Sequence, residues 1–405
     1  MATPAAPVAP ADVVLTFLES LGRRSEAELY LKLFRKLPKE SFAIIAPGAP
    51  VVRNALGSMV EELKFLADLD LFAPVLLGLY DPESAAASAE RLVKRLPAAG
   101  LDACPHTMDE PDLAERVREE LHAERIPILH FTPTEGVGLD QRLALVAGLV
   151  SKLQTHKFVL LRRRGGLGRR ERSSTNTRLS VINLRTDYQG LLAAKLMPKR
   201  DLELLDTARQ LIDLTAPLPL LVSVTSPLNL LKELFTVKGA GTLVKHGAQV
   251  QRHDSYQSLD VERLKALLEA SFGKLLHESF ISEPPLAVYL DAEYRGAAVI
   301  TPGPRAPYLS KFAVLPEAQG EGIGNDLWQA MQRDFPALYW RTRAENPIAA
   351  WYQGVCDGMV RRKPWHVFWR GLDPKLIPDL IADAESRPAD FQPPDLTPPP
   401  PATTT

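Results

Sequence analysis

A glycine-rich turn in the last third of the chain has the chemistry of an anion-binding site. Residues 319–324 read Gln-Gly-Glu-Gly-Ile-Gly. They follow an apolar run at 308–315 that predicts a strand, and they precede residues 325–333, which predict a helix. Glycines let a ligand approach the backbone closely, and the N-terminus of a helix favours negative charge. The turn is therefore predicted to bind a phosphate group.

The glycine spacing indicates which phosphate ligand is expected. The dinucleotide fingerprint G-x-G-x-x-G needs a glycine at its sixth position, and counting from Gly320 that position is Asn325. Gln319, Gly322 and Gly324 instead fit the Q/R-x-x-G-x-G/A turn, which resembles the turn that holds the acetyl-coenzyme A pyrophosphate in GNAT acetyltransferases. Taken alone, the pattern fits a ligand-free glycine turn equally well.

Two arginines on one predicted strand form a second candidate site. Side chains two residues apart on a strand point to the same face, so Arg341 and Arg343 are expected to lie together. A guanidinium group pairs bidentately with a carboxylate, and Asn346 adds an amide nearby. The alternative is a solvated strand edge with two exposed arginines.

Lys311 and Tyr352 are the remaining candidates. Alternation along the predicted strand puts Lys311 on the apolar face of Leu309 and Ala313, where a lysine is costly unless it pairs with an anion. A substrate carboxylate is one interpretation, and a lysine reaching out to the sheet edge is the other. Tyr352, on a short predicted helix at 349–353, could protonate a leaving thiolate. Its alternative is a core aromatic residue.

The elements that must position these residues form two groups, so the fold class is α/β with a second, α+β domain. Residues 12–245 alternate predicted strands and helices, which favours a doubly wound, mostly parallel sheet. Polar residues 246–255 predict a linker, and 256–375 predict a compact α+β domain. Residues 1–11 and the proline-rich tail at 388–405 are predicted to be disordered. In the first group, strands are predicted at 42–45, 72–79, 127–131 and 157–161, and helices within 13–37 and at 58–69, 85–96 and 139–153.

Composition excludes several classes of protein. The formal net charge of −1 argues against nucleic acid as a partner, and no apolar run is long enough to span a membrane. An arginine-rich stretch at 162–170 lacks an aromatic platform for nucleic acid, so a solvated or intersubunit loop is favoured. Two distant cysteines fit a reducing compartment, and scattered histidines predict no metal site. Residues 1–10 carry no basic residue, so a cytoplasmic location is expected.

In combination, these motifs resemble the vertebrate-like N-acetylglutamate synthases, a family that bacteria also have as bifunctional synthase–kinases. The similarity to its acetyltransferase domain rests on residues 311–314, 317–324, 340–347 and 351–352. The similarity to its amino-acid kinase domain rests on residues 165–167, 180–188 and 234–243. The resemblance implies an amino-acid-kinase-like domain followed by a GNAT domain.

The resemblance also implies an activity: L-glutamate N-acetyltransferase, which moves the acetyl group of acetyl-CoA to the α-amine of glutamate at the start of arginine biosynthesis. Glutamate would be held by Lys311, Arg341, Arg343 and Asn346, and Tyr352 would be the general acid. Residues implied to bind acetyl-CoA are Phe312, Ala313, Val314, Gln319, Gly320, Glu321, Gly322, Ile323 and Gly324. Arginine as an effector and a homotetramer are implied partners.

The kinase-like half departs from the family pattern at two turns. The family's Lys-x-Gly-Gly is replaced by 46–49, Ala-Pro-Gly-Ala, so the lysine that neutralises the transferring phosphate is missing and Pro47 removes a backbone donor. The family's His-Gly-x-Gly corresponds to Leu-Gly-Leu-Tyr at 77–80. The prediction is a degenerate kinase fold with a structural or regulatory role. An acetylglutamate kinase, a bifunctional synthase–kinase and a non-catalytic arginine-sensing scaffold are the alternatives.

Overall fold

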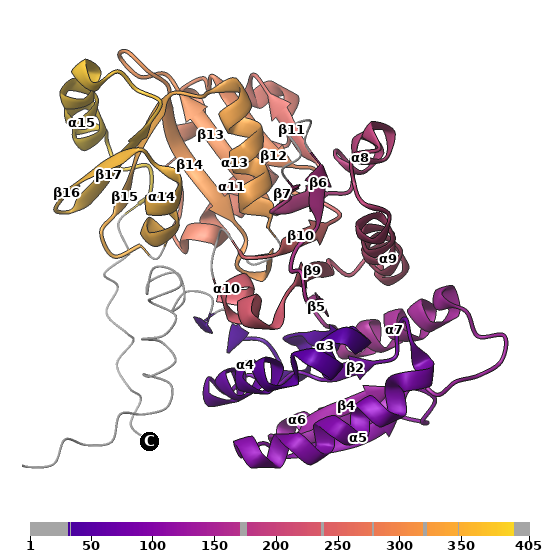
Figure 1. Cartoon of the computed structure of the whole chain (residues 1–405). Coiled ribbons are helices and arrows are strands. Elements are labelled where there is room, and N and C mark those ends of the chain that lie inside the picture. The colour runs from indigo at the N-terminus through magenta and orange to yellow at the C-terminus, as the bar shows by residue number, and fades with distance from the viewer. Residues whose placement is uncertain are drawn as a thin grey trace, which may run out of the picture. The chain divides into compact units, whose positions relative to one another are not determined.

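The computed structural model describes residues 31–392, apart from 33, 171–175, 236–238, 278, 319–321 and 347. The chain divides into two compact units, Met1–Gly247 and Ala248–Thr405 (Figure 1). The predicted disordered residues 1–11, most of the predicted helical segment 13–37 and residues 393–405 of the tail lie outside the described residues.

In its described part, the first unit is built on an eight-stranded sheet whose neighbouring strands are parallel except for β9 and β10. In sheet order the strands are β3 (Ala103–Thr107), β4 (Ile126–His130), β2 (Val75–Leu77), β1 (Ile44–Pro47), β5 (Lys157–Leu161), β9 (Leu221–Thr225), β10 (Thr242–Lys245) and β8 (Val181–Asn183). A separate ladder joins β6 (Gly168–Arg170) and β7 (Asn176–Arg178).

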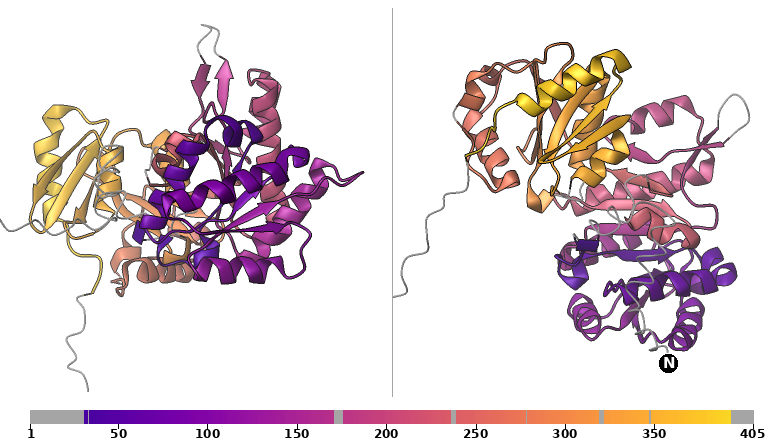
Figure 2. Two further views of the ribbon diagram at one scale, coloured as in Figure 1. Left: turned by 60° about the horizontal axis from the view of Figure 1, so that its bottom comes forward. Right: turned by 90° about the vertical axis from the view of Figure 1, so that its left-hand side faces the viewer.

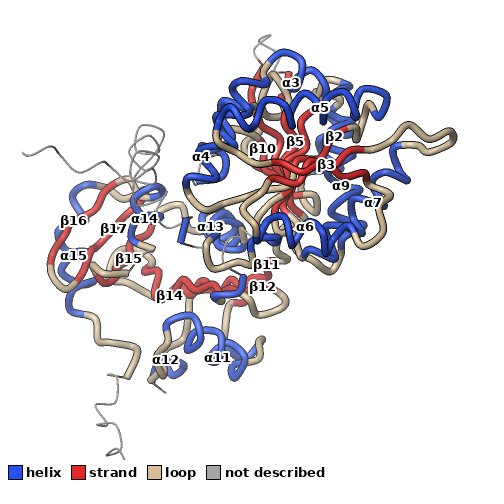
Figure 3. Tube along the Cα trace, turned by 90° about the horizontal axis from the view of Figure 1, so that it is seen from below, coloured by secondary structure: helices blue, strands red, loops and turns tan. Residues whose placement is uncertain are grey.

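Helices cover both faces of this sheet (Figure 3). They are α3 (Ala49–Asn54), α4 (Leu56–Asp68), α5 (Ala85–Arg95), α6 (Leu113–His122), α7 (Leu139–Leu153), α8 (Tyr188–Ala194), α9 (Lys199–Thr215) and α10 (Leu230–Phe235). With both faces covered, the central strands are buried from end to end, as in β1 and β9. The predicted doubly wound, mostly parallel fold is confirmed.

Agreement between prediction and structure depends on how apolar each segment is. Helix α7 and strand β5 have the predicted bounds, because both are dense in buried aliphatic side chains. Strand β3 and helix α6 were not predicted. β3 reads Ala-Cys-Pro-His-Thr and lies at the sheet edge, where a proline is tolerated and apolar alternation is weak.

The described part of the second unit is built on a seven-stranded sheet that is antiparallel except between β14 and β15. In sheet order the strands are β11 (Val250–His253), β12 (Ala287–Asp291), β13 (Gly296–Thr301), β14 (Tyr308–Val314), β15 (Leu338–Arg343), β17 (Trp365–Arg370) and β16 (Gly358–Arg362). The segment 246–255 is therefore not simply a linker, because it contains β11. This edge strand is largely polar, and its two central residues, Gln251 and Arg252, are exposed.

Helices pack on both faces of this second sheet. On one face, α13 (Ile323–Asp334) and α14 (Ala349–Val355) enclose an aromatic-rich core. The opposite face is covered by α11 (Val261–Phe272), α12 (Ser279–Ser282) and α15 (Ile377–Ser386). Helix α15 is the yellow helix at the C-terminal end of the ribbon in Figure 2, and it extends the unit beyond the predicted boundary at residue 375.

Gly296 allows α13 to pack closely on β13. A Cβ atom at this position would lie 2.8 Å from Ile323 Cγ2 and 2.9 Å from Leu327 Cδ1. Ile323, Leu327 and Met331 form the predicted apolar stripe of α13, and all three are buried. The start of α13 is thus held firmly against the sheet. Throughout the described ranges, no helix is long and apolar enough to cross a membrane.

Candidate functional site

A β-bulge in β14 decides which way Lys311 points. Val299 on β13 pairs with Lys311, whereas the next residue, Ile300, pairs with Leu309, so Ser310 is an extra residue on β14. Simple alternation across β14 is therefore broken. Lys311 lies on the sheet face opposite Leu309, and the predicted shared face of these two residues is wrong.

The two parallel strands of the sheet separate just beyond this bulge. Their pairing consists of Tyr308 with Tyr339 and Leu309 with Trp340, although β14 and β15 both continue for several residues. Past these pairs, the facing edges of the two strands are not joined by the ladder. We call this opening between the ends of β14 and β15 the notch. Strand edges of this kind can pair with an extended, amide-bearing ligand.

Helix α13 begins beside this notch. Its N-cap is Gly322, whose φ of 80° is a left-handed conformation that favours glycine. A Cβ on Gly324 would lie 3.6 Å from Val314 and 3.7 Å from Phe312, so the first turn of the helix rests on the end of β14. The structure thus brings together Phe312, Val314 and the described part of the glycine turn. Gln319, Gly320 and Glu321 lie outside the described residues.

The two arginines of β15 lie against one indole ring. The guanidinium carbons of Arg341 and Arg343 are 4.0 Å and 4.6 Å from the centroid of Trp365 on β17, which places them on the same face. Their mutual repulsion is offset by cation–π contact. Arg341 also donates from Nη1 to Ala384 O at 2.5 Å and from Nη2 to Pro388 O at 2.7 Å. It therefore caps the C-terminal end of α15.

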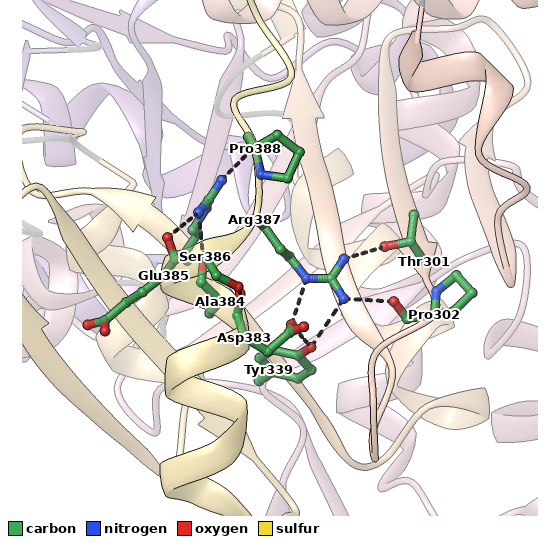
Figure 4. A network of polar contacts seen from close by, with 10 residues as sticks. Thr301, Pro302, Tyr339, Asp383, Ala384, Glu385, Ser386, Arg387 and Pro388 are labelled. Carbon is green, nitrogen blue, oxygen red and sulfur yellow. Dashed lines mark hydrogen bonds and ion pairs between the residues drawn. The ribbon is translucent and has the colours of Figure 1, made fainter.

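A second arginine, Arg387, fastens the end of α15 to the sheet (Figure 4). Its Nε donates to Asp383 Oδ2 at 2.7 Å, and its Nη2 donates to Pro302 O at 2.8 Å. The Tyr339 hydroxyl also donates to the Asp383 carboxylate. Charge-assisted bonds of this kind are strong and directional, so they fix where the chain goes after α15.

Lys311 is buried and already has an anionic partner. Its side chain is 4% exposed, and its ammonium group forms an ion pair with Asp390. It also donates to Ser310 O at 3.2 Å and lies 4.6 Å from the ring centroid of Phe280. Burial lowers the pKa of Lys311, and the Asp390 carboxylate opposes that shift. Asp390 belongs to the segment that composition assigned to a disordered tail.

Tyr352 lies on the other face of the sheet. Its ring packs 5.5 Å from the ring centroids of both Trp340 and Phe368, and the residue is 5% exposed. Burial raises the pKa of Tyr352, with a further contribution from Tyr308, so the phenol keeps its proton at neutral pH. Asn346, just before α14, accepts a hydrogen bond through Oδ1 from Ile348 N at 3.2 Å.

Three residues of this region were missed by sequence reasoning. Tyr308 is buried at the start of β14, where burial raises its pKa to about 12 and Arg341 and Arg387 lower it. Trp365 and Asp390 are the others. An apolar pattern could have marked Tyr308 and Trp365 only as core residues, and no local signal marks Asp390.

The two altered turns of the kinase-like unit meet at a small cavity. It is lined by Ala46, Pro47, Gly48 and Ala49 from one turn and by Leu77, Gly78, Leu79 and Tyr80 from the other. Its volume is about 30 Å³, which is room for about two water molecules. Within the described chain, no three histidine, cysteine or acidic side chains gather where they could hold a metal ion.

Comparison with known proteins agrees with this two-part arrangement. Residues 251–387 match the family model described as "NAT, N-acetyltransferase, of N-acetylglutamate synthase". A protein of Xanthomonas campestris named acetylglutamate kinase is 32% identical, over 87% of this chain and 95% of its own length. The human protein named N-acetylglutamate synthase, mitochondrial, is 35% identical, over 67% of this chain and 51% of its own length.

A solved structure shares the fold over most of the chain. The N-acetylglutamate synthase of Neisseria gonorrhoeae, complexed with coenzyme A and N-acetylglutamate, aligns with a TM-score of 0.53 at 16% identity. The alignment covers 85% of this chain and 97% of that one. At this identity the likeness establishes the fold.

Proposed function

The chain belongs to the family of N-acetylglutamate synthases and related acetylglutamate kinases, and from this premise we propose that it is an L-glutamate N-acetyltransferase. It would transfer the acetyl group of acetyl-CoA to the α-amine of glutamate, the entry step of arginine biosynthesis. The single observation that carries the proposal is the notch between β14 and β15 with the start of α13 beside it.

Acetyl-CoA suits this notch in two ways. Its pyrophosphate would lie at the N-terminus of α13, where free helix N–H groups and the helix dipole favour an anion. Its pantetheine arm carries two amides, which would pair with the strand edge of β14 at Phe312 and Ala313. The site would thus act mainly by placing the thioester next to the amine. No metal is needed for this chemistry.

Glutamate carries two carboxylates, which matches the cationic side chains on one face of the notch. Lys311, Arg341 and Arg343 supply positive charge there, and Asn346 supplies an amide at the start of α14. Arg341 and Lys311 already contact other parts of the chain. Arg343, whose side chain is exposed, is therefore the arginine best placed to meet an incoming carboxylate.

The reaction needs a proton donor on the opposite side of the thioester. The neutral amine attacks the carbonyl carbon and loses a proton to a base or to water, and the tetrahedral intermediate then breaks its carbon–sulfur bond. Tyr352 would give its proton to the departing sulfur. A phenol is protonated at neutral pH at its ordinary pKa of about 10, and burial raises the pKa of Tyr352 further, so the proton is present to be given.

An acetylglutamate kinase or a bifunctional synthase–kinase is the second candidate, favoured by the name of the X. campestris relative, which is matched over nearly its whole length. The cavity at 46–49 and 77–80 argues against it. Phosphoryl transfer relies on cationic groups that hold the phosphates, whereas no lysine, arginine or histidine is among the residues that line this cavity. The kinase-like unit is therefore proposed to be structural or regulatory, with arginine as effector, in a homotetramer.

Thiol release from acetyl-CoA tests the proposal. Purified protein is assayed with glutamate, aspartate, glutamine and a polyamine, each with and without arginine. Release with glutamate well above the other amines is expected. Release with a polyamine but not with glutamate would refute the proposed substrate.

A parallel assay addresses the alternatives. ATP-dependent phosphorylation of N-acetylglutamate would establish the kinase, and no binding of acetyl-CoA by calorimetry would favour a non-catalytic arginine-sensing scaffold. Fractionation of cells would test the expected cytoplasmic location, since the human relative is named as mitochondrial.

A further inference from the structure

The chain after α15 forms a strap across the carboxylate-binding face of the second unit. We define the strap as residues 387–392. It is anchored at its start by Arg387, which donates to Pro302 O, and by Pro388 O, which accepts from Arg341. At its far end Gln392 N donates to Leu275 O at 2.9 Å, and Phe391 packs 4.7 Å from Phe272 between ring centroids.

Asp390 lies at the middle of the strap, and its side chain reaches Lys311. Its backbone oxygen accepts from His277 N at 2.9 Å, and its carboxylate pairs with the Lys311 ammonium. The side chain of Asp390 is 32% exposed, whereas that of Lys311 is 4% exposed. The lysine is therefore the fixed, buried half of the ion pair, and the aspartate approaches it from the solvent side.

The group that Asp390 offers is chemically the same as the end of a dicarboxylic amino acid. An aspartate side chain presents a methylene group and a carboxylate, as does the distal end of glutamate. Lys311 has one ammonium group, whose other contacts are with Ser310 and the Phe280 and Phe391 rings. A substrate carboxylate that reaches Lys311 must therefore replace the Asp390 carboxylate or share the lysine with it.

The anchors at the start of the strap do not involve Lys311. Arg387 is held by Asp383, Tyr339 and Pro302, all of them away from Asp390. The strap can accordingly release Asp390 from Lys311 while its start stays attached at the end of α15. A segment tethered close to its site competes at a high effective concentration.

We propose that Asp390 is an intramolecular occupant of the substrate-carboxylate subsite at Lys311, and that a dicarboxylic amino acid displaces it on binding. The inference rests on the proposed function and adds a form of control to the same site. A subsite that the chain itself fills can bind substrate only while the strap is open. The apparent affinity for substrate is therefore the intrinsic affinity multiplied by the fraction of molecules in which the strap is open.

Kinetics of strap variants test the inference. Asp390→Asn removes the negative charge that competes with the substrate carboxylate. If the closed strap is about tenfold more populated than the open one, KM for glutamate should fall about tenfold. Both kcat and KM for acetyl-CoA should stay unchanged. Asp390→Glu retains a carboxylate and should restore a KM near the wild-type value. Asp379→Asn is the matched control, since it removes an exposed carboxylate from α15 and should change neither constant.

A permanently structural ion pair predicts the opposite result. If Asp390 only holds Lys311 in place, Asp390→Asn leaves the buried lysine unpaired, so kcat should drop or KM should rise. A lower kcat, a higher KM for glutamate or an unchanged KM for glutamate would each overturn the inference.

Hydrogen exchange on the wild-type chain provides a test that needs neither activity nor a variant. The probe is glutarate, a dicarboxylate with no amine. The amides of His277 and Gln392, which are bonded within the strap contacts, should exchange faster when glutarate is added and be unaffected by propionamide. Unchanged exchange at saturating glutarate would refute the strap's release.

The exchange result also separates two failures. If the protein acetylates another amine but glutarate still releases the strap, the proposed substrate is refuted and the displacement of Asp390 is supported. If the protein acetylates glutamate while the strap amides stay protected from exchange, the proposed substrate is supported and the displacement of Asp390 is refuted.

Discussion

Arg341→Ala is expected to destabilise the second unit, because Arg341 caps α15 as well as lying in the proposed substrate site. The side chain donates to Ala384 O at 2.5 Å, to Pro388 O at 2.7 Å and, more weakly, to Glu385 O at 3.4 Å. Hydrogen bonds made by charged groups contribute about 1.5–3 kcal/mol each where they are buried. A cation at a helix C-terminus adds about 0.3–1 kcal/mol.

These terms must be discounted, since the guanidinium group is only partly buried. Removing it should lower the free energy of unfolding by about 2–3 kcal/mol. Arg343→Ala is the matched comparison because Arg343 shares the Trp365 ring. It loses an exposed cation–π contact worth about 0.5 kcal/mol. Arg341→Lys keeps the charge without the planar fork and should recover less than half of the loss.

The assay is urea unfolding followed by tryptophan fluorescence. Trp328, Trp340, Trp351, Trp365 and Trp369 are the five tryptophans of the chain, so the signal reports on the second unit alone. An Arg341→Ala loss no larger than that of Arg343→Ala would refute the capping argument. A raised glutamate KM with unchanged stability would assign Arg341 to the substrate instead.

Three further changes test other parts of the molecule. Tyr352→Phe should lower kcat for thiol release by about 10²–10⁴-fold while unfolding changes little, because the ring stays packed; a kcat near wild type would remove Tyr352 as the acid. Gly322→Ala places an alanine in a left-handed backbone conformation, which should cost about 1–2 kcal/mol of stability. The substitution should raise KM for acetyl-CoA but not KM for glutamate. Equal effects on the two KM values would contradict the proposed pyrophosphate site. Burial raises the pKa of Glu62 to about 7, although the hydrogen bond from Leu231 N opposes this shift. As the pH rises, Glu62 therefore ionises in the unfolded chain before it ionises in the folded one. The free energy of unfolding should then fall between about pH 4.5 and 7. At pH 8, Glu62→Gln should be more stable than wild type by up to about 3 kcal/mol, and this difference should disappear toward pH 4.5. Unfolding followed by circular dichroism measures the difference. A stability difference that does not change with pH would refute the burial argument.

Local patterns predicted much of the fold. The long apolar helix α7 and the buried strand β5 were readable because each buries enough aliphatic side chains to repeat at its own period. The helix after the glycine turn and the strand that carries Arg341 and Arg343 were likewise readable, since a helix start and a strand face are set by neighbouring residues. Edge elements such as β3 and β11 were missed, because an edge strand needs little apolar character.

What the sequence determined by itself was the family, the two-part α/β architecture, and the residue types at the glycine turn. Only the tertiary structure decided how those residues are used. The bulge at Ser310 depends on the register with β13, and it turns Lys311 away from Leu309. Asp390 meets Lys311 across 79 residues, from a segment whose composition resembles a disordered tail. Periodicity describes only neighbours along the chain, whereas an ion pair between distant segments forms because folding brings their backbones together.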